Sequence, residues 1–165
     1  MYIAALNTLI LIVESAALSK WYDFYMTQAQ QLINDIVARH QLFGELCEEA
    51  SIAYKAGIYT ASLACLFVLI ETSLKFELEV DPRDKWGLHK VIEEARTRNL
   101  ITEDEYVTLS FLKTIRNKMF HEDAYSFVLE IGQESYFLSE PSTKQMIFQL
   151  HCEFVFGLVK RTVIK

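Results

Sequence analysis

Three chemically useful side chains lie within six residues, from Arg116 to His121. The guanidinium of Arg116 is a permanent cation that can bind a phosphodiester through two hydrogen bonds and stabilise negative charge that develops on it. The imidazole of His121 can give or take a proton near neutral pH. The amide of Asn117 can orient the imidazole or a phosphate oxygen. Together these groups are suited to breaking a phosphodiester bond by proton transfer.

The spacing of these residues limits how they can act together. On an ideal helix Asn117 and His121 share a face, whereas the directions of Arg116 and His121 differ by about 140°. Both act at one site only if the Arg116 stem reaches around, if the helix ends or distorts there, or if a second subunit supplies part of the site. An Arg-x4-His pair arises by chance in about one chain in seven of this composition, and basic residues are common at helix C-termini. The pattern alone therefore leaves open that His121 only caps a helix.

The elements that position this motif are expected to be long helices. Thr102 and Glu105 form a capping box, which predicts the start of a helix that carries the motif at its C-terminal end. Before it, the apolar run of residues 45–79 contains Gly57, which we expect to bend or divide the run into two antiparallel helices. The second of these, residues 59–78, is hydrophobic nearly all round and should be central. Glu71 is the exception on it, a carboxylate among apolar side chains.

Further elements are predicted on both sides of this core. Helical spacing and boundary signals predict helices over residues 21–42, 88–98 and 141–163, with a break at residues 81–84. Residues 126–139 are ambiguous, because the apolar triplets on either side of Gly132 are also the pattern of a small β-hairpin.

The N-terminal residues 2–13 are almost wholly apolar. They are too short to span a bilayer, for which about 20 residues are needed, and no Lys or Arg precedes them as in a secretory signal. We expect a packed helix there, with a subunit interface as one place for it, and no stable membrane insertion.

The composition favours a single all-α domain. Hydrophobic residues make up 52 % of the 165, and only five glycines and two prolines are present to punctuate strands. The three cysteines lack any CxxC spacing, so we expect reduced thiols in a cytoplasmic protein, with no metal site and no cofactor. The net charge of −6 argues against a nucleic-acid footprint over the whole surface, so any such contact needs a local basic patch.

The motif and the segments before it resemble the HEPN superfamily (higher eukaryotes and prokaryotes nucleotide-binding domains). Arg116, Asn117 and His121 match its Arg-Asn-x-x-x-His signature. Residues 49–61 are similar to its Ala…Gly-x-Tyr-x-x-Ala helical hairpin, and residues 70–75, Ile-Glu-x-x-Leu-Lys, are similar to the end of the following helix. The resemblance covers about residues 41–121, and the order and spacing of its parts carry it.

This resemblance implies an antiparallel bundle of HEPN type with an extra N-terminal helix, and usually a homodimer. Within a single domain over residues 1–165, residues 1–40 would form the extension, 41–125 the core that carries the motif, and 141–164 the C-terminal helix. In many family members two motifs meet at the dimer interface and form a metal-independent endoribonuclease site. Such proteins often act as toxins or in defence against phage, sometimes beside a nucleotidyltransferase antitoxin.

The function expected from this resemblance is cleavage of RNA by its own 2′-hydroxyl, which gives a 2′,3′-cyclic phosphate. Arg116, Asn117 and His121 would be catalytic; Lys113 and Lys118 would add weaker attraction for the substrate, and Glu71 would either touch the site or anchor a basic group. The alternative is a non-catalytic HEPN-like module that dimerises and binds a nucleotide, RNA or a protein partner. A purely structural helical protein is the third interpretation.

Overall fold

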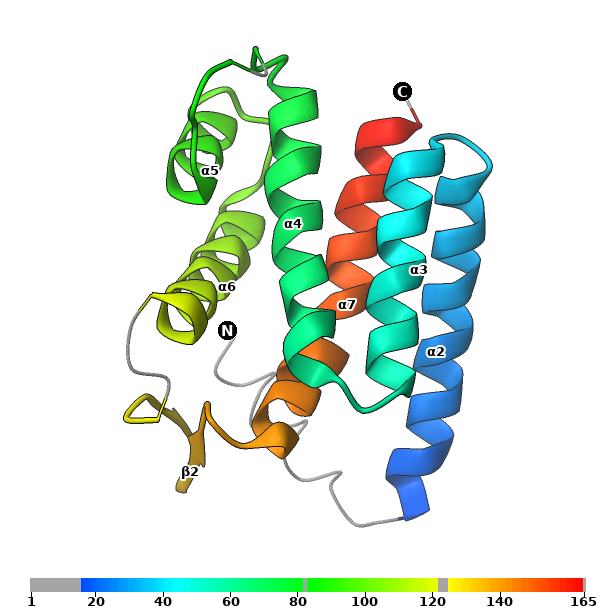
Figure 1. Cartoon of the computed structure of the whole chain (residues 1–165), viewed down its shortest axis with the longest axis vertical. Helices are drawn as coiled ribbons and strands as arrows, with labels where there is room; N and C mark the ends of the chain where they lie inside the picture. The colour runs from blue at the N-terminus through cyan, green and yellow to red at the C-terminus, as the bar shows by residue number, and fades with distance from the viewer. Residues whose placement is uncertain (1–15, 82, 122–124, 165) are drawn as a thin grey trace.

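The computed structural model describes residues 16–81, 83–121 and 125–164, with the backbone alone for residues 16–26. The apolar stretch 2–13, and the helix expected there, lie outside the described residues. The described elements follow one another around a helical bundle (Figure 1). In chain order they are α2 (Ala16–Val37), α3 (Gln41–Lys55), α4 (Tyr59–Glu77), α5 (Leu88–Thr97), α6 (Glu103–Phe120), β1 (Val128–Ile131), β2 (Glu134–Phe137) and α7 (Pro141–Val163). The expected all-α class is confirmed.

Gly57 divides the long apolar run into α3 and α4, as the sequence predicts. Its φ of +74° lies in the left-handed region that a glycine adopts without a Cβ clash. The N–H of Ile58 donates to the carbonyl of Ala53 at 2.9 Å, which closes the end of α3 before the chain turns back. α3 and α4 consequently run antiparallel and pack side by side (Figure 1).

The helix predicted over residues 21–42 is wrong at its C-terminal end, because α2 stops at Val37 and Leu42 belongs to α3. The N–H of His40 donates to the carbonyl of Ile36 at 2.8 Å and ends the helix. Gly44 then lies against α2, where an added Cβ would come within 2.5 Å of Cγ2 of Val37. This close approach depends on tertiary packing between α2 and α3, which periodicity alone does not reveal.

α4 is the central helix of the bundle, as expected from its apolar character. It packs against α3 and α7 on one side and against α5 and α6 on the other (Figure 1). Its buried side chains are Ser62, Leu63, Leu66, Phe67, Leu69, Ile70, Ser73 and Leu74. α7 runs parallel to α2 and α4 and antiparallel to α3, so the bundle mixes both directions (Figure 1). Among the described helices, α4 alone has the length and composition of a membrane span, a property that core helices of soluble proteins share.

The capping box holds the start of α6 as predicted. The hydroxyl of Thr102 accepts from the N–H of Glu105 at 3.3 Å, and the carboxylate of Glu105 accepts from the N–H of Thr102 at 2.7 Å. α6 then runs down the side of α4 and carries the Arg116 to His121 motif at its far end (Figure 1).

The ambiguous segment after α6 forms the β-hairpin. β1 and β2 pair antiparallel, with Val128 opposite Phe137, and Gly132 takes a φ of +66° in the turn. Buried Leu129 and Leu138 tie the hairpin to the bundle core. The hairpin therefore connects the end of α6 to the start of α7 at one end of the bundle (Figure 1).

Candidate functional site

The candidate site begins where α6 ends. His121 is the C-cap residue, with φ −127° and ψ −15°, and its backbone N–H donates to the carbonyl of Asn117 at 2.9 Å. The His121 side chain is exposed, whereas that of Asn117 is partly buried. The expected end of the helix at the motif is confirmed. The negative end of the helix dipole also favours the basic side chain in the last turn of α6.

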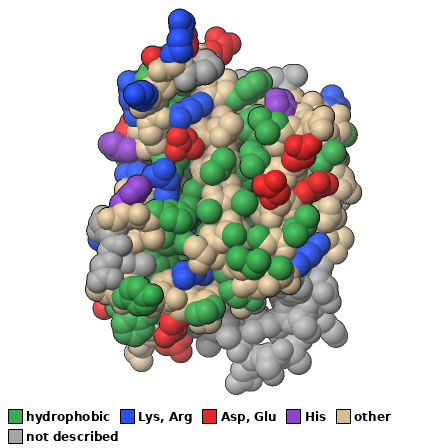
Figure 2. Space-filling model, in the orientation of Figure 1, with side chains coloured by type: hydrophobic (Ala, Val, Ile, Leu, Met, Phe, Trp, Pro, Cys, Tyr) green, Lys and Arg blue, Asp and Glu red, His purple; other side chains and the backbone are tan. Residues whose placement is uncertain are grey.

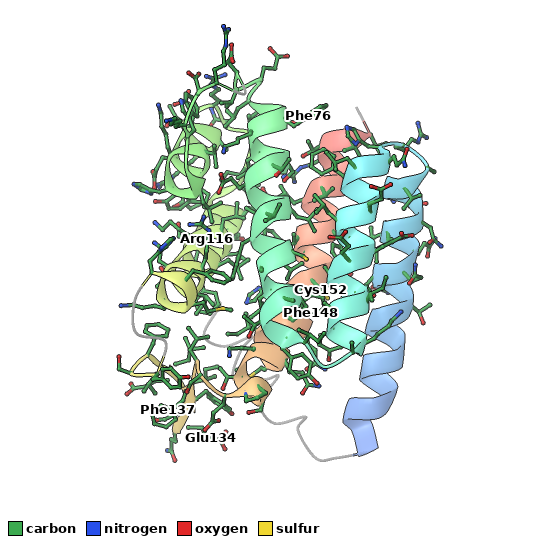
Figure 3. The ribbon with its side chains drawn as sticks, in the orientation of Figure 1. Phe76, Arg116, Glu134, Phe137, Phe148 and Cys152 are labelled. Carbon is green, nitrogen blue, oxygen red and sulfur yellow. The ribbon has the colours of Figure 1, made fainter. Side chains whose placement is uncertain are left out.

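Arg116 faces α4, where it approaches Glu71. Its Nη2 atom lies 3.8 Å from Oε2 of Glu71, while Oε1 of the same carboxylate accepts from Nζ of Lys75 at 2.6 Å. The side chain of Glu71 is 23 % exposed and that of Arg116 is 31 % exposed. One carboxylate thus lies between two cations, which leaves an excess of one positive charge in a partly buried place. Figure 3 labels Arg116 on α6 beside α4.

The two lysines expected near the motif point to different neighbours. Nζ of Lys113 lies 3.4 Å from Nδ1 of His89 on α5. Nζ of Lys118 lies 5.4 Å from the centre of the Phe127 ring, just before the hairpin. The lysines therefore extend the positive charge in two directions from Arg116.

The structure brings together Glu71 and Arg116, but it does not join Arg116 to His121 within the described chain. No hydrogen bond or ion pair links the His121 ring to any other described residue. The motif of one chain therefore presents a cation toward α4 and an imidazole toward solvent, as separate groups.

Two residues near the site were missed by reasoning from the sequence. Lys75 shares the Glu71 carboxylate, and its position four residues after Glu71 on one helix was an available signal. His89 meets Lys113 from a position 24 residues away, and no sequence pattern links the two.

Phe120 packs edge to face on Phe67 of α4, with ring centres 6.2 Å apart, and fixes the last turn of α6.

An open depression of about 570 Å³ lies at the other end of α6. Its two guanidiniums are already paired, Arg96 with Glu103 at 2.9 Å and Arg161 with Glu105 at 2.7 Å. Within residues 16–81, 83–121 and 125–164, no three His, Cys, Asp or Glu side chains gather into a possible metal site.

Burial shifts the pKa values of other titratable groups. Burial lowers the pKa of His151 to about 4, so this imidazole is neutral at neutral pH and packs against Phe111. Burial also raises the pKa of Cys47 and of Cys152 to about 12, helped in Cys47 by nearby Glu48. All three cysteines are free thiols. Cys47 and Cys152 belong to the buried core of the bundle.

No model of a protein family, no curated protein and no solved structure matches this chain. The resemblance to HEPN proteins therefore rests on the residues quoted above and stays a proposal.

Proposed function

We propose that this protein is a metal-independent endoribonuclease of the HEPN toxin or defence type, with Arg116, Asn117 and His121 as its site. The ion pair at Arg116 is the observation that carries this proposal. The carboxylate of Glu71 lies 3.8 Å from the guanidinium of Arg116 and accepts a close hydrogen bond from Lys75. Arg116 is therefore positioned by Glu71, but its hydrogen-bond donors are not all used. A guanidinium held in this way keeps hydrogen-bond donors for a phosphate.

The chemistry needs only groups that the chain and RNA supply. His121 exchanges a proton with the 2′-oxygen or with the departing 5′-oxygen, and the exposed ring has free access to both. The 2′-oxygen attacks the adjacent phosphorus, and the bond to the 5′-oxygen breaks. Arg116 stabilises the charge on the phosphoryl oxygens, and Asn117 orients the ring or the phosphate. The products are a 2′,3′-cyclic phosphate and a free 5′-hydroxyl.

A second copy of the chain is part of this proposal, because one chain does not join Arg116 to His121. The outward face of α4 offers a surface for it: Ala61, Ala64 and Cys65 are partly exposed and Val68 is 48 % exposed. Phe120, which is 47 % exposed, continues this surface onto α6. Hydrophobic side chains gather over α4 and its border with α6 in Figure 2. Two copies packed through this face would bring the two motifs toward each other.

The alternative is a non-catalytic module that dimerises and binds a nucleotide, RNA or a protein partner, such as a nucleotidyltransferase antitoxin. It is favoured by the same separation of Arg116 from His121. The two functions differ in one respect that is simple to measure, which is whether RNA is cut.

The test is incubation of the purified protein with RNA in excess EDTA. We expect cleavage that leaves 2′,3′-cyclic phosphate ends, and a loss of at least about a hundredfold in rate for His121→Ala and for Arg116→Gln. Arg98→Gln is the matched control, because Arg98 is an exposed arginine paired with Glu94 on α5. Uncut RNA, or equal cleavage by the wild type and His121→Ala, would contradict the enzyme proposal and leave the binding module.

A further inference from the structure

Most of the cations beside α5 and α6 are paired with carboxylates. Arg96 pairs with Glu103 and Arg98 with Glu94, both at less than 3 Å. Lys90 and Lys113 differ, because neither makes an ion pair with a carboxylate in the part of the chain that the structure describes. Both contact rings instead. Nζ of Lys90 lies 3.9 Å from the ring centre of Trp86, and Nζ of Lys113 lies 3.4 Å from Nδ1 of His89.

The cluster of Trp86, His89, Lys90 and Lys113 adjoins the candidate site. Lys113 precedes Arg116 by three residues on α6, so the two are neighbours about 4.5 Å apart along the helix axis. It precedes His121 by eight residues, or about 12 Å, a distance that a single strand of nucleic acid covers in a few nucleotides. His89 joins Lys113 from α5, and Trp86 and Lys90 extend the cluster toward the start of α5. Lys, Arg and His side chains line the same edge of the molecule in Figure 2.

The ring contacts prepare the two ammonium groups for a phosphate. An unrestrained lysine loses up to about 2 kcal/mol of side-chain entropy when it is fixed by a ligand. Trp86 is partly buried against the core and so holds the amine of Lys90 over a fixed surface. Cations interleaved with aromatic rings are also the composition of surfaces that bind single-stranded nucleic acids.

The carboxylate of Glu93 is a negative group that opposes this surface. Oε1 of Glu93 lies 3.7 Å from Nδ1 of His89 and accepts from the hydroxyl of Tyr106 at 2.9 Å. Its charge is expected to weaken the binding of an anion beside Lys113. Glu93 therefore provides a variant with the opposite sign of effect.

We propose that Trp86, His89, Lys90 and Lys113 form a subsite for single-stranded RNA on one side of the cleaved bond. Lys90 and Lys113 contact successive phosphates of the flanking strand. The place of cleavage rests on the function proposed above, whereas the binding of the strand does not require cleavage.

The binding test uses the full chain carrying His121→Ala, with a fluorescent single-stranded RNA and anisotropy measured at 50–200 mM salt. We expect Lys90→Gln with Lys113→Gln to weaken binding about tenfold and to reduce the slope of log affinity against log salt by about 1.4, or two phosphate contacts. Glu93→Gln should tighten binding about two- to fivefold.

The matched control is Lys55→Gln with Lys144→Gln, which removes the same charge from lysines that bind no carboxylate in the described chain and lie on α3 and α7. Equal loss in the control pair, no loss in the test pair, or equal competition by duplex RNA would overturn the subsite. So would absence of binding by the parent protein.

Cleavage of a series of oligonucleotides tests the subsite separately from the ribonuclease function. With wild-type protein, the rate should rise as the strand is lengthened by two or three nucleotides on one side of the cut, and Lys90→Gln with Lys113→Gln should abolish that rise. Binding without cleavage would contradict the ribonuclease function and support the subsite. A cleavage rate that does not change with the length of the strand on either side of the cut would contradict the subsite alone.

Discussion

The carboxylate of Glu71 determines the charge around Arg116. The sequence indicates only one of the two basic partners of this carboxylate. A carboxylate in an apolar helix indicates a basic partner, and Lys75 four residues later is one such partner. The second partner, Arg116, lies 45 residues away on α6, so its contact depends on how α4 and α6 pack. Under the proposed function, Glu71 would position Arg116 and would also compete with a phosphate for it.

Replacing Glu71 by Gln should separate these two effects. Loss of the negative charge should tighten RNA binding by about two- to fivefold, as expected for one partly exposed charge. Loss of the positioning contact should slow cleavage at saturating RNA. Anisotropy and single-turnover cleavage measure the two quantities. Weaker binding in Glu71→Gln would show that the carboxylate does not oppose the phosphate.

His151 should make the free energy of unfolding depend on pH. Its pKa in the folded protein, about 4, lies below the value of 6.5 expected in the unfolded chain, because burial disfavours the charged ring. The unfolded chain therefore binds more protons between these values, so stability is full above pH 6.5 and falls as the pH drops toward 4. Between pH 7.5 and pH 5 the loss from this residue should be about 2 kcal/mol.

Urea unfolding at the two pH values measures this loss in the wild type and in His151→Leu. The difference between pH values should shrink by about 2 kcal/mol in the variant, since carboxylates titrate equally in both proteins. An unchanged pH dependence would mean that His151 is protonated in the folded state.

At the scale of elements, α6 is a helix that the sequence predicts well. Its capping box, its length and the position of the motif at its end all follow from local signals, because caps involve residues only three apart. The boundary between α2 and α3 was missed for the opposite reason. The contact of Gly44 with Val37 joins two helices, and the apolar spacing continues across the break.

Removing the cap should destabilise the helix that carries the site. Thr102→Ala deletes the hydroxyl that accepts from Glu105 and should cost about 1 kcal/mol in the free energy of unfolding. Thr97→Ala is a suitable control, because that hydroxyl donates to the carbonyl of Glu93 at the exposed end of α5. Urea denaturation compares the two. An equal effect at both positions would indicate that the capping box contributes nothing specific.

At the scale of the molecule, the bundle presents an apolar face on α4 and a basic edge on α5 and α6 (Figure 2). The sequence predicts α4 as central but not which of its side chains stay exposed, because that depends on the neighbours that cover it. Val68 at 48 % exposed is the clearest example. The separation of Arg116 from His121 was foreseen from helical geometry, whereas the place of His89 beside Lys113 was not.

The α4 face should carry the contact between two copies. Val68→Glu puts a charge in this face and should shift a dimer toward monomer by at least about tenfold in dissociation constant. Val107→Glu is the matched control, since Val107 is 49 % exposed on α6 near its N-terminal end. Sedimentation equilibrium measures both. A dimer unaffected by Val68→Glu would place the interface elsewhere, and a monomeric wild type would exclude a shared site.

The most direct test of a shared ribonuclease site is a mixture of two inactive variants. Arg116→Gln and His121→Ala are refolded together at equal concentration, and RNA cleavage in EDTA is compared with the wild type and with each variant alone. If Arg116 of one copy acts with His121 of the other, half of the dimers contain one intact site, and about a quarter of the wild-type rate should return. A mixture as inactive as its two components, beside an active wild type, would contradict a site built from two chains.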